Sequence, residues 1–240
     1  MCMSTHAIES RVGYSTRLPA AARQQLPWIA AGLLGGFLVP FVLADQLNTP
    51  KDLYYGIYGL LVIGFLAAWV RVTELPWRDA VRRHWRLAIG LAVICGAILA
   101  FIVLRADATS RPAGIRLIGA VVWRGIFYGA IDGLLLSSFP ILATFAAFKG
   151  SRLERPGRSG KAAIGIVALV VSLVMAAVYH VGYSDFRSGK VRSPVAGDVV
   201  WSLPTLLTLN PIGAPIAHAA MHTTAVLHSY HTDLFLPPHR

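Results

Sequence analysis

The sequence predicts an all-α fold, a polytopic transmembrane helical bundle of about six to eight membrane helices with a broken C-terminal helix pair. Composition is the first observation: 55% of the 240 residues are hydrophobic and 14% are charged, whereas soluble proteins carry about a quarter charged residues. The mean hydropathy of +0.59 agrees with this. The second observation is that the apolar residues form long runs, and the third is that NPIGAP, residues 210–215, interrupts the last run.

The expected transmembrane domain covers residues 26–230. A membrane span needs roughly 20 predominantly apolar residues. By this criterion the predicted spans are 26–44, 53–70, 87–104, 125–148 and 162–181, followed by 198–209 plus 214–229 on the two sides of the interruption. Non-helical backbone at membrane depth persists only where protein or a water-filled cavity covers it. The interruption therefore marks a candidate site.

The predicted domain lies between an N-terminal cytoplasmic tail, residues 1–25, and a C-terminal tail, residues 231–240. Lys and Arg number thirteen in the first tail and loops 71–86 and 149–161, against seven in the opposite loops. The positive-inside rule then places the N-terminus and these two loops in the cytoplasm. Because the first apolar run is too long for a cleavable signal peptide, we expect a multi-pass protein of the cell membrane.

The net charge of +11 is spread over short loops between apolar runs. A protein that binds nucleic acid gathers such charge into one patch or arm. We therefore expect the lipid bilayer, with its phosphates, as the partner of these cations, and no nucleic acid. The only two cysteines, Cys2 and Cys95, form neither a disulfide framework nor a thiolate metal site. Any bound metal would need nitrogen or oxygen ligands.

The fourth predicted span carries an acid, Asp132, about two turns from its start. Such a group costs on the order of 3 kcal/mol in a membrane and is a functional candidate by default. Glycine recurs every fourth residue in this span, at Gly125, Gly129 and Gly133, which lets a neighbouring helix approach closely. Arg124, Tyr128 and Asp132 repeat with the same period. The alternative is that Asp132 pairs with Arg124 or caps a neighbouring polar group, and that the glycines only pack.

Histidines are the second kind of candidate functional residue, and two of them are spaced as a pair on one helix. His218 and His222 are four residues apart, so on a helix both imidazoles point the same way, as in sites where two histidines share a metal ion. His180 lies near the end of the fifth span. His228 lies about 240° around the helix from His222. We expect His228 and the C-terminal pair, His231 and His239, to be interfacial.

Asp132 together with His180, His218 and His222 satisfies the needs of a three-ligand metal site with an open position. Zinc is the metal we expect there, and a carboxylate beside it can act as general base. Proton relays and ion pathways in membranes use the same residue types. Residue type alone does not choose between hydrolysis and transport.

From roughly residue 120 to 230 the order of features resembles the CAAX-processing and bacteriocin-processing (CPBP/Abi) intramembrane metalloproteases. That family has a glutamate pair with a downstream arginine, a phenylalanine four residues before a histidine, and a histidine four residues before an asparagine. Here a span ends in His180, and NPIGAPIAHAAMH places His218 as the last family histidine and His222 as the asparagine. The glutamate pair is missing from the spans, and Ala176 replaces the phenylalanine.

The resemblance implies a metal-dependent endopeptidase that cleaves a peptide or membrane-protein substrate. In this interpretation His180 and His218 bind zinc, His222 binds or orients, and Asp132 is a ligand or the catalytic base. The alternative is a non-catalytic membrane protein, such as a transporter, a proton or metal relay or a scaffold, with a buried Asp/His site.

Overall fold

The computed structural model describes residues 19–151, 153, 158–231 and 234–237. Within these ranges the chain is helical and contains no strand, which confirms the predicted all-α bundle. Most of the predicted N-terminal tail, part of loop 149–161 and the last residues of the C-terminal tail, including His239, lie outside the described residues.

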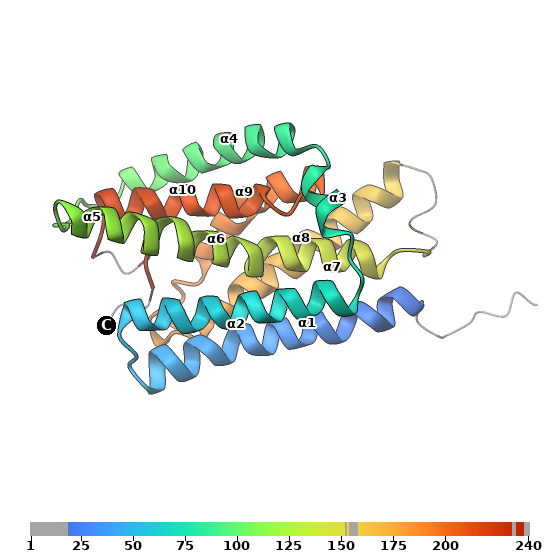
Figure 1. The fold of residues 1–240 in the computed structure, drawn as a ribbon, viewed down its shortest axis with the longest axis horizontal. Coiled ribbons are helices and arrows are strands. Elements are labelled where there is room, and N and C mark those ends of the chain that lie inside the picture. Colours follow the sequence, from blue (N-terminus) through green and yellow to red (C-terminus); the bar gives the residue numbers. More distant parts are fainter. Residues whose placement is uncertain (1–18, 152, 154–157, 232–233, 238–240) are drawn as a thin grey trace, which may run out of the picture.

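The helices run back and forth along one axis of the molecule (Figure 1). Their bounds are α1 Ala20–Val39, α2 Lys51–Val72, α3 Trp77–Arg82, α4 Trp85–Leu104, α5 Ile115–Ala120, α6 Tyr128–Gly133, α7 Phe139–Ala147, α8 Arg158–Val181, α9 Arg192–Thr208 and α10 Gly213–His228. Three π-helical turns extend or join them, namely η1 Pro40–Gln46, η2 Val121–Phe127 and η3 Leu134–Ser138, and η5 Ser184–Phe186 is a short 3-10 turn.

Five helical segments of the described chain are long and apolar enough to cross a membrane. They are Ala20–Gln46, Lys51–Val72, Trp85–Leu104, Ile115–Ala147 and Ser159–Val181. Helices α9 and α10, with 17 and 16 residues, are shorter. A protein with this set of helices is a membrane protein, as the sequence predicts.

Three predicted helix starts lie six or more residues from those observed. Helix α1 begins at Ala20, inside the predicted N-terminal tail, instead of 26. The fourth membrane helix begins at Ile115 instead of 125, and α9 begins at Arg192 instead of 198. A hydropathy criterion locates only the apolar part of a helix. It therefore misses terminal helical turns that carry charged residues. In the fourth helix Arg116 is exposed and Arg124 is paired with Asp52, so both cations extend the helix without burying an unpaired charge.

The interruption between α9 and α10 is observed where the sequence predicts it. Leu209 ends α9 with a positive φ of 53°. Polar side chains satisfy the backbone that follows: Oδ1 of Asn210 accepts from the N–H of Ile212 at 3.0 Å, and Oγ1 of Thr205 accepts from the N–H of Ala214 at 2.9 Å. These bonds meet the requirement that non-helical backbone inside a membrane protein be covered.

Helix α10 is the central element of the bundle. It contacts α4, α6, η2 and α9, and in Figure 1 it lies between α4 and the segment that runs from α5 to α7. Both imidazoles of its histidine pair are buried, with 2% of each residue exposed. The helix that carries the candidate ligands is therefore enclosed by other helices.

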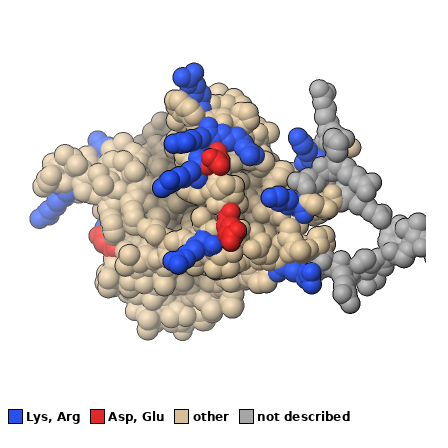
Figure 2. Space-filling model, turned by 45° about the vertical axis from the view of Figure 1, so that its right-hand side comes forward, with Lys and Arg blue, Asp and Glu red and all other residues tan. Residues whose placement is uncertain are grey.

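Cations gather at one end of the bundle, where α2 and α7 end and where α8 and α10 begin. We call this the basic end; Figure 2 shows its Lys and Arg side chains. Its described cations are Arg23, Arg71, Arg78, Arg82, Arg83, Arg86, Lys149 and Lys161. The alternation of the helices thus brings the two basic loops together. The assignment of this end to the cytoplasm stays a prediction.

Candidate functional site

The glycine stripe of the fourth membrane helix packs directly on the backbone of α10. A Cβ atom at Gly129 would lie 2.8 Å from Cα of Ala219, and one at Gly133 would lie 2.6 Å from Cα of Pro215. Real Cβ atoms essentially never approach within 3.0 Å of a neighbour. The predicted close approach is therefore confirmed, and it brings Asp132, next to Gly133, against α10.

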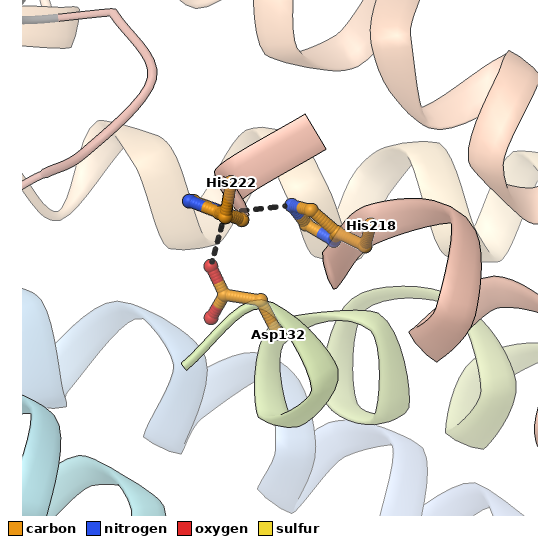
Figure 3. A group of neighbouring side chains, drawn as sticks. All are labelled: Asp132, His218 and His222. Carbon is orange, nitrogen blue, oxygen red and sulfur yellow. Dashed lines mark hydrogen bonds and ion pairs between the residues drawn. The ribbon is translucent and has the colours of Figure 1, made fainter. Parts of the chain in front are cut away.

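Three of the predicted site residues meet at this seam. Figure 3 shows the Asp132 carboxylate on α6 directed at the imidazoles of His218 and His222 on α10. Nε2 of His222 lies 3.1 Å from Nε2 of His218 and 3.8 Å from Oδ2 of Asp132. One ligand atom from each residue lies within 4.8 Å of the other two. All three residues are buried, with at most 2% exposed.

These distances fit a shared metal ion. Two ligand atoms at zinc-bond length and tetrahedral angle are about 3.3 Å apart, close to the 3.1 Å between the two histidine nitrogens. Two imidazole nitrogens and one carboxylate oxygen form a donor set that zinc accepts. Oδ2 of Asp132, 3.8 Å from Nε2 of His222, lies beyond this separation, so a three-ligand arrangement would require the carboxylate to move inward.

Several polar atoms around the three side chains have no hydrogen-bond partner among the described residues. They are Oδ1 of Asp132, Nδ1 of His218, Nδ1 of His222 and the hydroxyl of Tyr58. A buried polar atom without a partner costs about 1–3 kcal/mol. Such atoms are few in most proteins and require an explanation. Tyr58 lies beside the Asp132 carboxylate and the backbone of Phe235 lies beside the His222 ring, so these atoms are grouped around one polar centre.

The predicted pairing of Asp132 with Arg124 is wrong, whereas the other part of that alternative, contact with neighbouring polar groups, agrees with the tyrosine hydroxyls beside Asp132. Arg124 forms a two-pronged ion pair with Asp52 of α2, with Nε 2.8 Å from Oδ1 and Nη2 2.7 Å from Oδ2. The Asp132 carboxylate lies instead beside His222, with Oδ2 3.8 Å from Nε2. Asp132 is therefore a buried acid that faces imidazoles and not a guanidinium.

His180 lies on the wall of the same cavity, outside the three-residue group. Its Nδ1 is 2.7 Å from the carbonyl oxygen of Ala176. Because a carbonyl only accepts hydrogen bonds, Nδ1 of His180 is the donor in this contact. The ring nitrogens of His180 are not among the ligand atoms that lie within 4.8 Å of one another. The roles predicted for the four residues remain predictions.

The cavity has a volume of about 310 Å³, and Asp132 and the three histidines all border it. The rest of its lining is mostly apolar, including Leu99, Ile102, Val200, Met221, Leu234 and Phe235. Ile102, on the outer side of α4, is 48% exposed. A ligand of this cavity would place an apolar group beside the polar site.

Aromatic stacking fixes the two imidazoles of the pair. The His218 ring stacks on Trp201 of α9 with centroids 4.2 Å apart, and on His222 with centroids 4.8 Å apart. Tyr128 meets His222 edge to face at 5.0 Å. Because side chains held by packing hold a site in one geometry, both Nε2 atoms stay directed toward Asp132.

A cluster of tyrosine hydroxyls beside Asp132 was not predicted. The hydroxyls of Tyr54 and Tyr183 are 2.6 Å apart, those of Tyr183 and Tyr179 2.8 Å, and those of Tyr179 and Tyr128 2.8 Å. Tyr128, Tyr179 and Tyr58 face the Asp132 carboxylate. The signal was present, because Tyr179 and Tyr183 repeat at the same four-residue spacing as the histidine pair.

A second buried acid, Asp198, was also missed. The hydroxyls of Ser137, Ser172 and Ser202 lie 2.7–2.9 Å from its carboxylate oxygens. Ser172 is also 2.9 Å from the carbonyl oxygen of Leu136, the acceptor that Pro140 leaves without its usual partner. Asp198 lies one turn before Trp201, so this cluster anchors α9 behind the ring that stacks on His218.

The other described histidines lie away from the cavity. Nε2 of His228 is 2.9 Å from the carbonyl oxygen of Ala106, and the backbone N–H of His231, an exposed residue, donates to Thr109. This agrees with the expectation that they lie at the end of the last helix. No protein-family model, curated protein or solved structure matches the chain at a significant level.

Proposed function

We propose that this protein is a membrane-embedded, metal-dependent hydrolase, and more specifically an endopeptidase of the CPBP/Abi type. One observation carries the proposal: Asp132, His218 and His222 present one ligand atom each within 4.8 Å, buried at the edge of a cavity. Catalytic zinc sites use three protein ligands and leave one position open. The resemblance of residues 120–230 to the metalloprotease family supports the choice of peptidase.

The proposed ligand atoms are Oδ2 of Asp132 and Nε2 of His218 and His222. When bound, zinc supplies Lewis acidity that polarises a carbonyl group. We assign His180 the role of proton acceptor, because it borders the same cavity as the three proposed ligands and the hydrogen bond between its Nδ1 and Ala176 orients the ring. This division differs from the initial prediction, in which His180 was a ligand and Asp132 a ligand or the base.

The apolar walls of the cavity favour an apolar peptide segment as substrate. Ser193 and Pro194, at the first turn of α9, also line it, so the cavity extends toward the end of the bundle opposite the basic end. If the basic end is cytoplasmic, as the positive-inside rule predicts, the cavity belongs to the outer half of the membrane.

Cleavage of a transmembrane peptide library tests the proposal. We expect zinc-dependent cleavage by the purified protein in liposomes and a loss of about 10²–10⁴ in kcat for His180→Gln, which removes the proton acceptor and keeps the zinc. His228→Gln, on α10 but outside the cavity, is the matched control and should cleave normally. Products would be identified by mass spectrometry. A zinc-loaded wild-type protein that cleaves no peptide would contradict the proposed hydrolysis but not the proposed metal site.

A proton relay is the second candidate, favoured by the hydroxyl chain that leads from Asp132. Tyr128, Tyr179, Tyr183 and Tyr54 are linked in this order by hydroxyl distances of 2.6–2.8 Å. Such chains of hydroxyls and acids carry protons in membrane proteins. This candidate needs no bound metal.

In liposomes with a pH gradient, Tyr179→Phe should lower proton flux about tenfold, because it removes the central hydroxyl of the relay. Tyr55→Phe is the control, since the Tyr55 hydroxyl donates to the carbonyl of Pro237 and lies outside the chain. Flux would be followed with an entrapped pH indicator. Wild-type flux no greater than that of empty liposomes would remove this candidate.

A further inference from the structure

A second cavity lies at the basic end, far along the bundle from the histidines. It has a volume of about 570 Å³ and runs between α8 and the last turns of α9. Gly165, Ile166 and Leu169 form one wall, and Leu206 and Leu207 form the other. Ile166 is 66% exposed and Leu207 63% exposed. This cavity is therefore an open groove whose apolar walls are exposed on the outside of the bundle. We call it the α8–α9 groove.

Three basic side chains stand at one end of the groove. Arg83 and His84 come from the connection between α3 and α4, and Lys161 comes from the first turn of α8. All three are exposed. Among the described residues that line the groove there is no Asp or Glu. The groove is thus cationic at its mouth and apolar beyond it.

The cationic mouth is held in place by the interruption before α10. Nδ2 of the fully buried Asn210 donates to the backbone carbonyl of Val81 at 2.7 Å and to that of Arg83 at 2.6 Å. A loop fixed by two hydrogen bonds to a buried side chain presents its cations at a defined position. Arg83 is therefore held over the groove by the backbone on which it sits.

We propose that the α8–α9 groove binds an anionic phospholipid, with its phosphate between Arg83 and Lys161 and its acyl chains along the two helices. Basic pockets between membrane helices bind anionic headgroups, and each nearby cation adds to the attraction. A soluble anion would use Arg83 and Lys161 but leave Ile166 and Leu207 without a partner. Only an amphipathic ligand matches both the charged mouth and the apolar walls.

The groove shares no lining residue with the cavity of the histidines. Thr208 and Leu209, directly before the turn from which α10 begins, also line the groove. A lipid in the groove would hold the α3–α4 connection against this turn. The proposed lipid site is independent of the proposed hydrolase function and is tested by a separate experiment.

Native mass spectrometry of the delipidated protein in detergent measures this binding directly. We expect phosphatidylglycerol to bind at least about tenfold more tightly than phosphatidylcholine. Arg83→Ala combined with Lys161→Ala should weaken phosphatidylglycerol binding about 30-fold, which corresponds to about 2 kcal/mol. The matched control removes one arginine and one lysine at the opposite end, Arg116→Ala with Lys190→Ala, and should leave the affinity unchanged.

A variant that keeps every charge tests the apolar part of the groove. A Cβ atom at Gly165 meets nothing within 4 Å, and the same is true of Gly90 on α4. Gly165→Leu would place its side chain in the groove and should weaken phosphatidylglycerol binding about tenfold, whereas Gly90→Leu should not.

Three results would overturn the proposal. Equal affinities for the two lipids would remove the role of the negative charge. An equal loss of phosphatidylglycerol affinity in the control variant, Arg116→Ala with Lys190→Ala, would show that the effect depends on net charge and not on this groove. Displacement of phosphatidylglycerol by inorganic phosphate at the same concentration, together with an unaltered Gly165→Leu variant, would show an anion site without a lipid groove.

Discussion

Replacing both His218 and His222 by alanine is expected to weaken zinc binding by at least about 100-fold, because two of the three proposed ligands are removed. Asp132→Asn should weaken it less, since an amide oxygen still reaches the ion but without negative charge. Metal content after dialysis against a chelator, together with the absorption spectrum of a cobalt-substituted sample, measures this. Because removing two buried rings leaves a cavity beside Trp201 and Tyr128, the helical content of the double variant is checked by circular dichroism before its zinc content is compared.

Two single variants separate the ligand assignments. His180→Ala should keep its zinc, because the ring nitrogens of His180 lie outside the group within 4.8 Å. His228→Ala, on the same helix, should keep it as well. If His180→Ala loses as much zinc as His218→Ala, the initial prediction of His180 as a ligand is right and the division of roles proposed above is wrong.

Gly133→Ala is expected to lower the free energy of unfolding by about 2–3 kcal/mol, which is typical of overpacking and lowers Tm by roughly 4–12 °C in a chain of this size. The added Cβ would lie 2.6 Å from Cα and 2.8 Å from N of Pro215, both backbone atoms that cannot rotate away. Helix α10 must then move from α6, so zinc affinity should fall together with stability. Thermal unfolding in detergent measures the first effect.

The control is Gly119→Ala in the same helical segment, where a Cβ atom meets nothing within 4 Å. Because alanine favours a helix by up to about 1 kcal/mol over glycine, this variant should be as stable as the wild type or more so. If both variants unfold at the wild-type temperature, the backbone contact between α6 and α10 does not position the site.

Local patterns in the sequence predicted several parts of the molecule. NPIGAP predicts the interruption because it concentrates two prolines and a glycine in six residues, whereas the isolated prolines Pro27 and Pro204 lie inside α1 and α9. The four-residue spacing of His218 and His222 predicts a shared direction because it depends on one helix alone. The glycine stripe predicts a close contact for the same reason, although its partner surface, Pro215, Ala219 and Thr223, becomes known only from the fold.

Properties that depend on several helices were not predictable. Asp198 stands at the edge of a predicted span, and its burial depends on Ser137 and Ser172 from two other helices. Likewise, the grouping of Asp132 with the α10 pair instead of His180 depends on how closely α6 and α10 approach. Spacing along one helix carries no information about such distances.

The most direct test of the central claim is the zinc content of the purified wild-type protein. Plasma mass spectrometry of protein prepared without chelators should find about one zinc ion per chain, or one after zinc is added and the excess removed. The double variant His218→Ala with His222→Ala should contain almost none. A wild type that retains no zinc or other transition metal, even after the addition of zinc, would contradict the account.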